Sequence, residues 1–580
     1  PLYNATLNTS STNNYTDLTN NTYIEWMAGN GFKVTGRFGF NNTVNGSEQF
    51  FPGSHTKFIN LTGDNLFLRG SYDKGNGKFS MVSGDLNVNY SKSFGKHILF
   101  TNIGANIRED KSESYLYSAV GFPNNKMNSI IFAKQYALNS KPTGDEAINR
   151  EIGALALVNY SYDNRYFADF SLRTSASSQF GSENRWGSFW AAGAGWNLHH
   201  ERFLSHLVFV NQLKLRGSVG YTGSQNFNSY QAMLLYNYFL DNSYQGMLGT
   251  YLNGLSNPEL KWQQKLDYNI GVDASLFNNL SLRVDLYRSI TTNLLTDITT
   301  PPSLGFSSYK ANLGQIENTG VEFRANYRMF VNTGKRQSLN VFVSGISNKN
   351  RIMKISNSLK SLTSNQDKLS QTSNKPLVRF EEGQSLDAIW AVPSRGIDPA
   401  TGKEIFVKKD GSFTETWSSD DKVVAGINQP KLSGNFGANF EYMGLSVGFI
   451  ATYRMGGQIY NQTLVDKVEN AQLNYNVDSR AYYDSWKKPG DNVLFKSIGT
   501  VRNPTLATSR FVQDLNEWQV ASVNLGYDFY RHEFVRKMKL QRLQVLLNAN
   551  DVLRMSTVKI ERGTSYPFAR YFSFTIMANY

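Results

Sequence analysis

The stretch LDYNIGVDASLFNNLSLRVDLYRSITT, residues 266–292, contains two arms in which apolar and polar residues alternate. Asn278 and Asn279 separate the two arms. A period of two places successive side chains on opposite faces of a β-strand, so the stretch predicts a β-hairpin. The apolar face consists of Leu266, Tyr268, Ile270, Val272, Ala274 and Leu276 in the first arm and Leu280, Leu282, Val284, Leu286 and Ile290 in the second.

The length and the charges of this hairpin favour a membrane-crossing pair of strands. Each arm alternates for about eleven residues, whereas strands of soluble proteins usually have about five or six, and a tilted strand crosses a bilayer in about nine to eleven. The polar face carries Asp267, Asp273, Arg283 and Asp285, which a packed core would have to neutralise and a hydrated lumen would not. We therefore expect lipid on the apolar face and the lumen of a large barrel on the polar face. A hairpin of a soluble β-sandwich is the alternative.

The composition of the 580 residues excludes several other classes of protein. No run of about 18 or more apolar residues occurs, which excludes helical membrane spans. The chain contains no cysteine, so it has neither a disulfide framework nor a thiolate metal site. The net charge of +13 is scattered instead of forming one basic patch, which argues against nucleic-acid binding. The mean hydropathy of −0.41 does not exclude a barrel, because every second residue of a barrel strand is polar.

The same alternation recurs along the chain and predicts about 16 strands. Short turns join the strands in pairs, and polar connections of about 15 to 80 residues separate the pairs, as in barrels with short periplasmic turns and long extracellular loops. We therefore predict an all-β fold, a transmembrane antiparallel β-barrel of the outer-membrane type, as one domain over residues 1–580. The Asn/Thr/Ser-rich residues 1–20 are predicted to form a polar loop and do not resemble a signal peptide. The predicted strands are 31–40, 83–91, 97–107, 152–162, 166–173, 187–197, 212–221, the two arms of 266–292, 320–330, 338–348, 431–442, 445–455, 518–529, 541–550 and 570–580.

The last predicted strand ends the chain on an aromatic residue. Its apolar residues alternate with Tyr571, Ser573, Thr575, Met577 and Asn579. A final amphipathic strand of this kind resembles the signal by which the outer-membrane assembly machinery captures its clients, although a last strand can also end in Tyr by chance. The residues of this predicted assembly signal are Phe572, Phe574, Ile576, Ala578 and Tyr580.

Several separated segments also carry motifs in a specific order over nearly the whole chain. They are NYSYDNRY (159–166), FG (180–181), NRWG (184–187), AGW (194–196), LKLRGS (213–218), GYTGSQ (220–225), NPELKW (257–262), NLGQIENTGVE (312–322), GIDPATG (396–402), SRFV (509–512), NANDV (548–552) and YP (566–567). With these motifs the chain resembles the SusC/RagA family of TonB-dependent outer-membrane transporters of Bacteroidetes.

This resemblance implies a barrel of about 22 strands around an N-terminal plug. It also implies a TonB box that contacts an inner-membrane energy complex, and a SusD-like surface lipoprotein that serves as a lid. The sequence departs from this pattern, because it has about 16 predicted strands and no stretch that resembles a plug or a TonB box. We expect the plug and roughly the first six strands to lie outside this sequence, since an open sheet would leave two unpaired edges in lipid.

The sequence contains no pattern that indicates catalysis. It has no P-loop, no GxSxG nucleophile turn and no HExxH zinc motif, so we expect no enzyme activity, no cofactor and no metal site. Aromatic side chains in predicted loops and strand mouths are candidates for contacts to a substrate or a partner, with packing between the loops as the alternative. These candidates are Trp262, Trp390, Trp417, Tyr482, Tyr483 and Trp486.

Two functions from different classes are consistent with these features. The first is energy-coupled import of an oligosaccharide or peptide nutrient across the outer membrane, with a SusD-like lipoprotein and the TonB complex as partners. The second is a structural subunit of a larger outer-membrane complex, in which a transporter-like barrel no longer transports. A simple porin without a plug is a third and weaker possibility.

Overall fold

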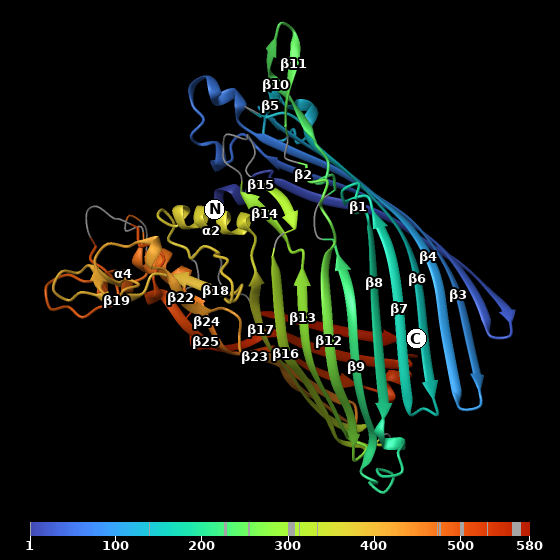
Figure 1. The fold of residues 1–580 in the computed structure, drawn as a ribbon. Helices are drawn as coiled ribbons and strands as arrows, with labels where there is room; N and C mark the ends of the chain where they lie inside the picture. Colours follow the sequence, from blue (N-terminus) through green and yellow to red (C-terminus); the bar gives the residue numbers. More distant parts are fainter. Residues whose placement is uncertain are drawn as a thin grey trace.

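One large antiparallel sheet, the wall, makes up most of the molecule in a computed structural model of the chain (Figure 1). Each long strand pairs with its predecessor along the chain, so neighbouring strands are joined without crossovers. The structure describes residues 2–137, 140–225, 229–252, 256–299, 308–312, 314–332, 334–471, 474, 477–498, 504–530, 532–559 and 570–580.

The wall has 18 strands, one of which, β5 (Gln135–Tyr136), is only two residues long. The others are β1 (Ser10–Gly29), β2 (Phe32–Phe51), β3 (Ser71–Phe94), β4 (His97–Val120), β6 (Thr143–Tyr162), β7 (Tyr166–Ser177), β8 (Trp186–Asn197), β9 (Val210–Ser224), β12 (Gln263–Leu276), β13 (Leu280–Thr292), β16 (Gln315–Asn332), β17 (Gln337–Lys354), β23 (Leu432–Tyr442), β24 (Leu445–Tyr460), β25 (Val512–Asp528), β26 (Arg542–Ser556) and β27 (Tyr571–Asn579). The predicted all-β antiparallel fold is thereby confirmed.

The predicted hairpin at residues 266–292 is confirmed as the pair β12 and β13. The two strands pair in register from Gln264↔Thr292 to Leu276↔Leu280. The turn is one residue longer than the predicted Asn278-Asn279, because it also contains Phe277. Phe277 and Asn278 both have left-handed backbone angles, with φ of 54° and 61°, and such angles let the chain reverse within three residues.

The N-terminal region differs from its prediction. Residues 1–20 were expected to form a polar loop, but β1 begins at Ser10 and pairs with β2 along its whole length. The wall therefore has one long strand more than predicted. The strands β1 to β4 have 20 to 24 residues, about twice the number that a bilayer requires. Their upper halves lie beyond the hydrocarbon and need no apolar residues, which is why the polar sequence concealed β1.

The apolar residues of successive strands form continuous rows on one face of the wall. Starting from Leu266, cross-strand pairs connect Tyr221, Trp190, Leu172, Ala156, Ile103, Val88, Val34 and Trp26. Several members of this face are large and exposed, among them Ile270 at 60%. A broad exposed apolar face of this kind is the lipid-contacting surface of a barrel.

Stacked aromatic rings mark the lower boundary of this lipid-facing surface, next to the short turns. Tyr162 stacks with Tyr166 at 6.4 Å between ring centroids, and Tyr166 with Trp196 at 6.2 Å. Glu201 accepts hydrogen bonds from the Tyr166 hydroxyl and the Trp196 indole. Such rings form the aromatic girdles of outer-membrane barrels, because they are apolar on one side and hydrogen-bond on the other.

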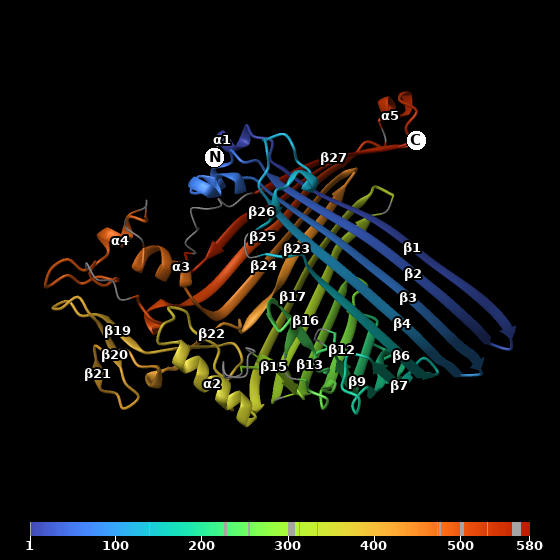
Figure 2. The same cartoon turned by 90° about the horizontal axis from the view of Figure 1, so that it is seen from above.

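The long connections gather at the opposite end of the wall, as predicted. Seen from above, the wall curls so that β1 and β27 come to the same side of the molecule (Figure 2). Within the described residues, β1 pairs only with β2 and β27 only with β26. None of the described helices is long and apolar enough to cross a membrane. The elements at this end are α1 (Leu2–Ala5), β10 (Tyr236–Tyr244), β11 (Met247–Leu252), β14 (Leu295–Thr299), β15 (Ser308–Asn312), α2 (Asn357–Leu369), β18 (Ala388–Ala391), β19 (Ser394–Ile397), β20 (Glu404–Val407), β21 (Phe413–Thr414), β22 (Val423–Ile427), α3 (Gln462–Leu464) and α4 (Arg480–Tyr483). The helix α5 (Glu533–Lys537) lies between β25 and β26, at the short-turn end.

Candidate functional site

The inner face of the wall carries a network of opposite charges. Arg216 on β9 lies 2.9 Å from Asp273 on β12 and 2.5 Å from Asp285 on β13. Arg283 approaches Asp285 at 3.0 Å. Three of the four charges predicted to face a lumen, Asp273, Arg283 and Asp285, therefore lie together on the face opposite the apolar rows. The fourth, Asp267, pairs with Lys265 at 2.7 Å.

Gly271 makes this network possible. It lies between Arg216 and Asp285 in the cross-strand register. A β-carbon at Gly271 would lie 2.6 Å from the Arg216 guanidinium and 2.6 Å from the Asp285 carboxylate, closer than atoms pack. Because glycine has no side chain, the arginine of β9 reaches across β12 to the aspartate of β13.

A hollow of about 430 Å³ lies beside the network on the inner face. Its polar lining comes from β13, β16, β17 and β23, and includes Arg283, Asp285, Glu322, Arg324, Ser344 and Ser433. Carboxylates, guanidinium groups and hydroxyls at one surface bind a hydrated polar group by charge-assisted hydrogen bonds. The inner face is therefore suited to contact polar matter rather than lipid.

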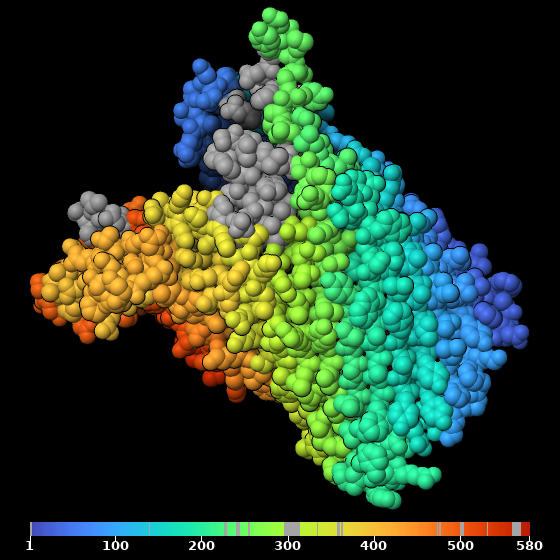
Figure 3. All heavy atoms as spheres, viewed as in Figure 1, coloured from blue at the N-terminus to red at the C-terminus, as the bar shows by residue number. Residues whose placement is uncertain are grey.

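The loops at the upper end form a second structured region, which we name the loop body and define as residues 388–427 and 461–511. It projects beside one end of the wall (Figure 3, yellow to red). Two small sheets, β18 with β22 and β19 with β20 and β21, belong to it. Its hydrophobic core consists of Val465, Val468, Ala471, Ala481, Phe495 and Phe511.

A buried ion cluster holds the loop body together. The guanidinium of Arg510 lies 3.0 Å from Glu404 and 2.7 Å from Glu469. The side chains of Arg510, Glu404 and Glu469 are only 10%, 6% and 0% exposed. Burial disfavours the charge on Arg510, but the two carboxylates outweigh that effect and raise the pKa of Arg510 above its ordinary value. The cluster joins β20, the segment after α3 and the segment before β25.

A buried lysine connects the loop body to α2. Lys422 donates to the Asp367 carboxylate at 3.1 Å and to the Ser370 hydroxyl at 2.6 Å. Burial lowers the pKa of Lys422, and Asp367 partly offsets this effect. Neither this pair nor the Arg510 cluster was predicted from the sequence. The only available signal was that Arg510 belongs to the motif SRFV, and that Glu404 follows the motif GIDPATG by two residues.

All four tryptophans among the candidates make packing or hydrogen-bonding contacts within the loops. Trp262 is buried, stacks on Phe180 at 4.3 Å and donates its indole N–H to the carbonyl of Arg185. Trp390 is buried under the guanidinium of Arg379. The structure therefore places these two rings inside the loops rather than on a surface.

Trp417 and Trp486 also tie loops to one another. Trp417 donates to the carbonyl of Ala507, and Trp486 donates to the carbonyl of Pro399. The Trp486 ring lies against Gly402, where a β-carbon would come within 2.5 Å of the indole. The half-buried Trp417 and Trp486 are thus oriented by backbone partners.

Tyr482 and Tyr483 are the two candidates whose rings lie on the surface. They belong to α4, are 57% and 71% exposed, and meet edge to face at 5.3 Å. The ammonium of Lys487 lies 4.1 Å from the centre of the Tyr482 ring. An exposed aromatic pair beside a cation is available for contact with a sugar, a peptide or another protein.

The residues of the predicted assembly signal lie together on the outer edge strand of the wall. Phe572, Phe574 and Ile576 alternate outward and are all exposed, as is Tyr580. Their neighbours on β26 are also apolar, since Phe574 pairs with Leu547 and Ile576 with Val545.

In the described part of the chain, no group of three His, Cys, Asp or Glu side chains could hold a metal ion.

Comparison with known proteins identifies the family. The family model described as "TonB dependent receptor-like, beta-barrel" matches residues 2–550. The TonB-dependent receptor P39 of Formosa agariphila is 26% identical over 520 residues, which cover 80% of this chain and 48% of the relative. The TonB-dependent receptor SusC of Bacteroides thetaiotaomicron is 25% identical over 394 residues, which cover 66% of this chain and 38% of SusC.

A solved structure shares the fold. The structure of the RagAB peptide transporter matches with a TM-score of 0.82 at 20% identity, over 95% of this chain and 59% of that chain. The chain thus spans about half the length of the curated Formosa relative. The polar inner face, the apolar outer face and the matched family model lead to one conclusion: the chain belongs to the TonB-dependent receptor β-barrel family, of the SusC/RagA type, and is an outer-membrane protein.

Proposed function

We propose that the protein imports an oligosaccharide or peptide nutrient across the outer membrane. The observation that carries this proposal is the inner face of the wall, whose charged network and 430 Å³ hollow offer a polar surface on the side away from lipid. Family membership supports the same function. The peptide class comes from the similar RagAB structure, which is that of a peptide transporter. The oligosaccharide class comes from the sequence resemblance to the SusC/RagA family.

The proposed partners are a SusD-like surface lipoprotein and the TonB energy complex. A lipoprotein lid would contact the upper end of the wall, where the exposed Tyr482–Tyr483 pair and the loop body lie. Contact with TonB would use a segment outside this sequence. Outer-membrane import against a gradient needs such coupling, because the outer membrane lies apart from the energy source.

Uptake of labelled oligosaccharide and peptide mixtures by intact cells tests this function. We expect a strain deleted for the gene to lose uptake of at least one class, and a protonophore to abolish the same uptake in the parent strain. Deletion of the proposed SusD-like lipoprotein should have the same effect. Normal growth of the deletion strain on every oligosaccharide and peptide source would overturn the proposal. Stable co-purification with several unrelated proteins, together with normal growth, would instead indicate a structural subunit.

A further inference from the structure

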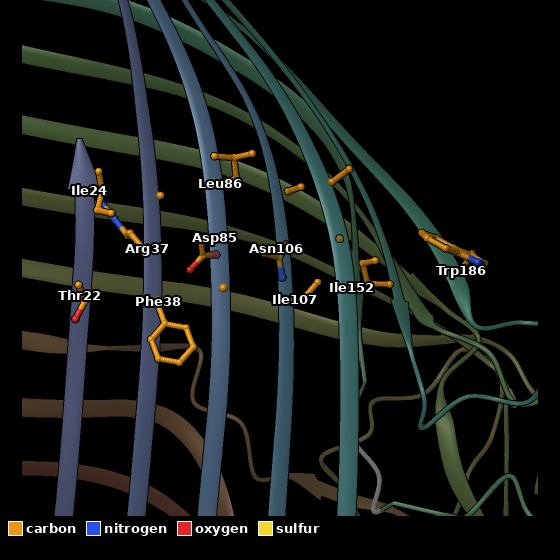
Figure 4. Close-up of a pocket in the computed structure, with 15 residues that line it drawn as sticks. Thr22, Ile24, Arg37, Phe38, Asp85, Leu86, Asn106, Ile107, Ile152 and Trp186 are labelled. Carbon is orange, nitrogen blue, oxygen red and sulfur yellow. The ribbon is translucent and has the colours of Figure 1, made fainter. Parts of the chain in front are cut away.

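An apolar groove crosses the outer face of the wall from β1 to β8 (Figure 4). Its volume is about 640 Å³, within the range of about 300–1,000 Å³ typical of small-molecule sites. Two cross-strand rows build most of it, and Arg37, Asp85, Asn106 and Gly153 between these rows also line it. The first row is Ile24, Gly36, Leu86, Ala105 and Ala154, and the second is Thr22, Phe38, Gly84, Ile107 and Ile152, with Trp186 at the far end.

Small residues form the floor of this groove. Gly36, Ala105 and Ala154 belong to the first row, and Gly84 belongs to the second. A β-carbon added at Gly36 would meet no atom within 4 Å, so the space above this residue is open. The large side chains of Phe38, Leu86 and Ile107 stand beside the floor, and Figure 4 shows them along neighbouring strands. The hollow is therefore a property of the folded wall and not of one strand.

The groove lies within the lipid-facing band. Its two rows lie on the lipid-facing side of the wall. The next row toward the short turns contains Trp26, Val34, Val88 and Ile103 of that side, and every second residue of a strand lies on the same face. From Phe32, the first residue of β2 at the short-turn end, to Phe38 is only seven residues, less than the span of about nine to eleven residues that crosses a bilayer. Hydrocarbon therefore surrounds the groove.

A charged pair lies directly above the groove on the same face. Ile107 pairs with Ile152, and the next outward pair on these strands is Glu109 with Arg150. The Arg150 Nε lies 2.6 Å from the Glu109 carboxylate, and the arginine side chain is 68% exposed. Within the described residues the two terminal nitrogens of Arg150 have no hydrogen-bond partner. One row higher, Lys111 is paired with Glu113 at 2.7 Å and with Glu146 at 3.3 Å, so Arg150 is the cation that this level offers to an anion.

We propose that the groove binds one acyl chain of a phosphorylated glycolipid of the outer leaflet, whose phosphate contacts Arg150. The apolar lining complements the chain in shape, because van der Waals packing holds an acyl chain against a protein surface inside hydrocarbon, where there is no water to exclude. The free edge of the guanidinium complements the phosphate, which it binds through two parallel N–H donors. Arg150 lies toward the long loops, so a headgroup at this level belongs to the outer leaflet. This lipid would order β1 to β6 at the membrane boundary.

Quantification of the lipid that remains on the full-length protein tests the proposal. The protein is purified from outer membranes in mild detergent, and native mass spectrometry identifies the bound lipid. Gly36→Leu fills the open space of the floor, and Arg150→Gln removes the guanidinium. We expect each variant to retain roughly tenfold less phosphorylated glycolipid than the parent protein. Heat-modified mobility in gels confirms that each variant is folded.

Two matched variants on the other side of the wall serve as controls. Arg288→Gln removes an exposed arginine that pairs with Glu317 at 2.5 Å on β13 and β16. Ala438→Leu enlarges a lipid-facing residue of β23, outside the groove. Both should retain the lipid. Equal lipid retention by all five proteins would overturn the proposal, as would a retained lipid of the phospholipid class. Capture of a protein instead of lipid by a photoreactive group at residue 105 would also contradict it.

Discussion

At the scale of single residues, Arg510 has the largest expected effect on the loop body. Replacing it by methionine keeps most of the side-chain volume but leaves Glu404 and Glu469 buried without a cation. Breaking a buried ion pair in this way costs about 3–5 kcal/mol. We therefore expect Arg510→Met to make the loop body, residues 388–427 and 461–511, sensitive to protease while the wall stays folded, which limited proteolysis with mass spectrometry measures.

The control for this change is Arg395→Met. Arg395 is exposed, and its guanidinium only covers the ring of Phe413 at 5.4 Å. This variant should keep the protease resistance of the parent protein. Equal resistance of Arg510→Met and Arg395→Met would contradict the role assigned to the buried cluster.

Asp478 gives the loop body a dependence on pH. Its carboxylate accepts hydrogen bonds from the side chain and the backbone N–H of Arg480, and these lower the pKa of Asp478 to about 2. A carboxylate whose pKa is lowered by folding stabilises the folded state at pH values above its ordinary pKa of 3.8. This contribution is lost as the pH falls toward about 2. Hydrogen exchange at α4, corrected for intrinsic rates, should therefore lose protection between these two values.

The variant Asp478→Asn tests this origin. It should show weak protection of α4 at neutral pH and no further loss in acid, whereas Asp410→Asn in the turn before β21 should leave α4 unchanged. An acid transition at α4 that persists in Asp478→Asn would assign the effect to another group.

The aromatic candidates show what sequence reasoning can and cannot reach at this scale. A tryptophan in a polar loop has the same sequence signature whether it packs or binds. Trp486 packs because Gly402, distant in the chain, leaves room for the indole, and Trp417 is oriented by the carbonyl of Ala507. Such contacts depend on how loops fold against one another, which periodicity does not encode. Tyr482 and Tyr483 remain candidates because their rings are exposed.

At the scale of elements, the alternation of β12 and β13 makes a direct prediction. Ile270 faces lipid, so Ile270→Arg should destabilise the wall by about 2–4 kcal/mol, the cost of a cation on the lipid face near the middle of a bilayer. Ser281→Arg on the polar face of β13 should change stability by less than about 0.5 kcal/mol. Urea unfolding followed by gel mobility measures both values. A similar cost for the two variants would contradict the assignment of the faces.

The last strand makes a second prediction at this scale, which concerns assembly. Phe574→Ser and Tyr580→Ser remove outward aromatic side chains of the predicted assembly signal, so the protein should accumulate in the periplasm instead of the outer membrane. Thr575→Ser changes the neighbouring position of β27 on the other face and serves as the control. Membrane fractionation measures the distribution. Normal insertion of both aromatic variants would show that the terminal strand does not act as an assembly signal.

Strands were predictable where one face contacts lipid and unpredictable beyond it. The alternating sequence located β12, β13 and most of the other long strands. The Asn- and Thr-rich part of β1 was not predicted as a strand, because above the bilayer neither face of the strand must be apolar. β1 is held there by its register with β2, where Asn41 and Thr43 donate to the carboxylate of Asp17. Such cross-strand polar contacts stabilise a strand whose sequence shows no alternation of apolar and polar residues.

At the scale of the whole molecule, the wall presents two chemically different faces. The rows that contain Leu266 and Ile270 are apolar, and the opposite face carries the network of Arg216, Asp273 and Asp285. The sequence predicted this division, because it follows from a period of two. The loop body could not be predicted, since its buried cluster joins Glu404, Glu469 and Arg510 from three separate segments. In the described part of the chain β1 and β27 each have one unpaired edge. Such edges would be costly in lipid, so in the membrane we expect both to be paired.

Single-cysteine scanning of residues 266–276 tests the two-faced wall most directly. The chain contains no cysteine, so each introduced thiol is the only one in this sequence. In intact outer membranes, a spin label at the even positions should show contact with oxygen dissolved in lipid, and one at the odd positions contact with a water-soluble relaxing agent. That alternation is the predicted result. Water accessibility at both sets of positions, or the reverse alternation, would contradict a lipid-facing wall around a polar lumen.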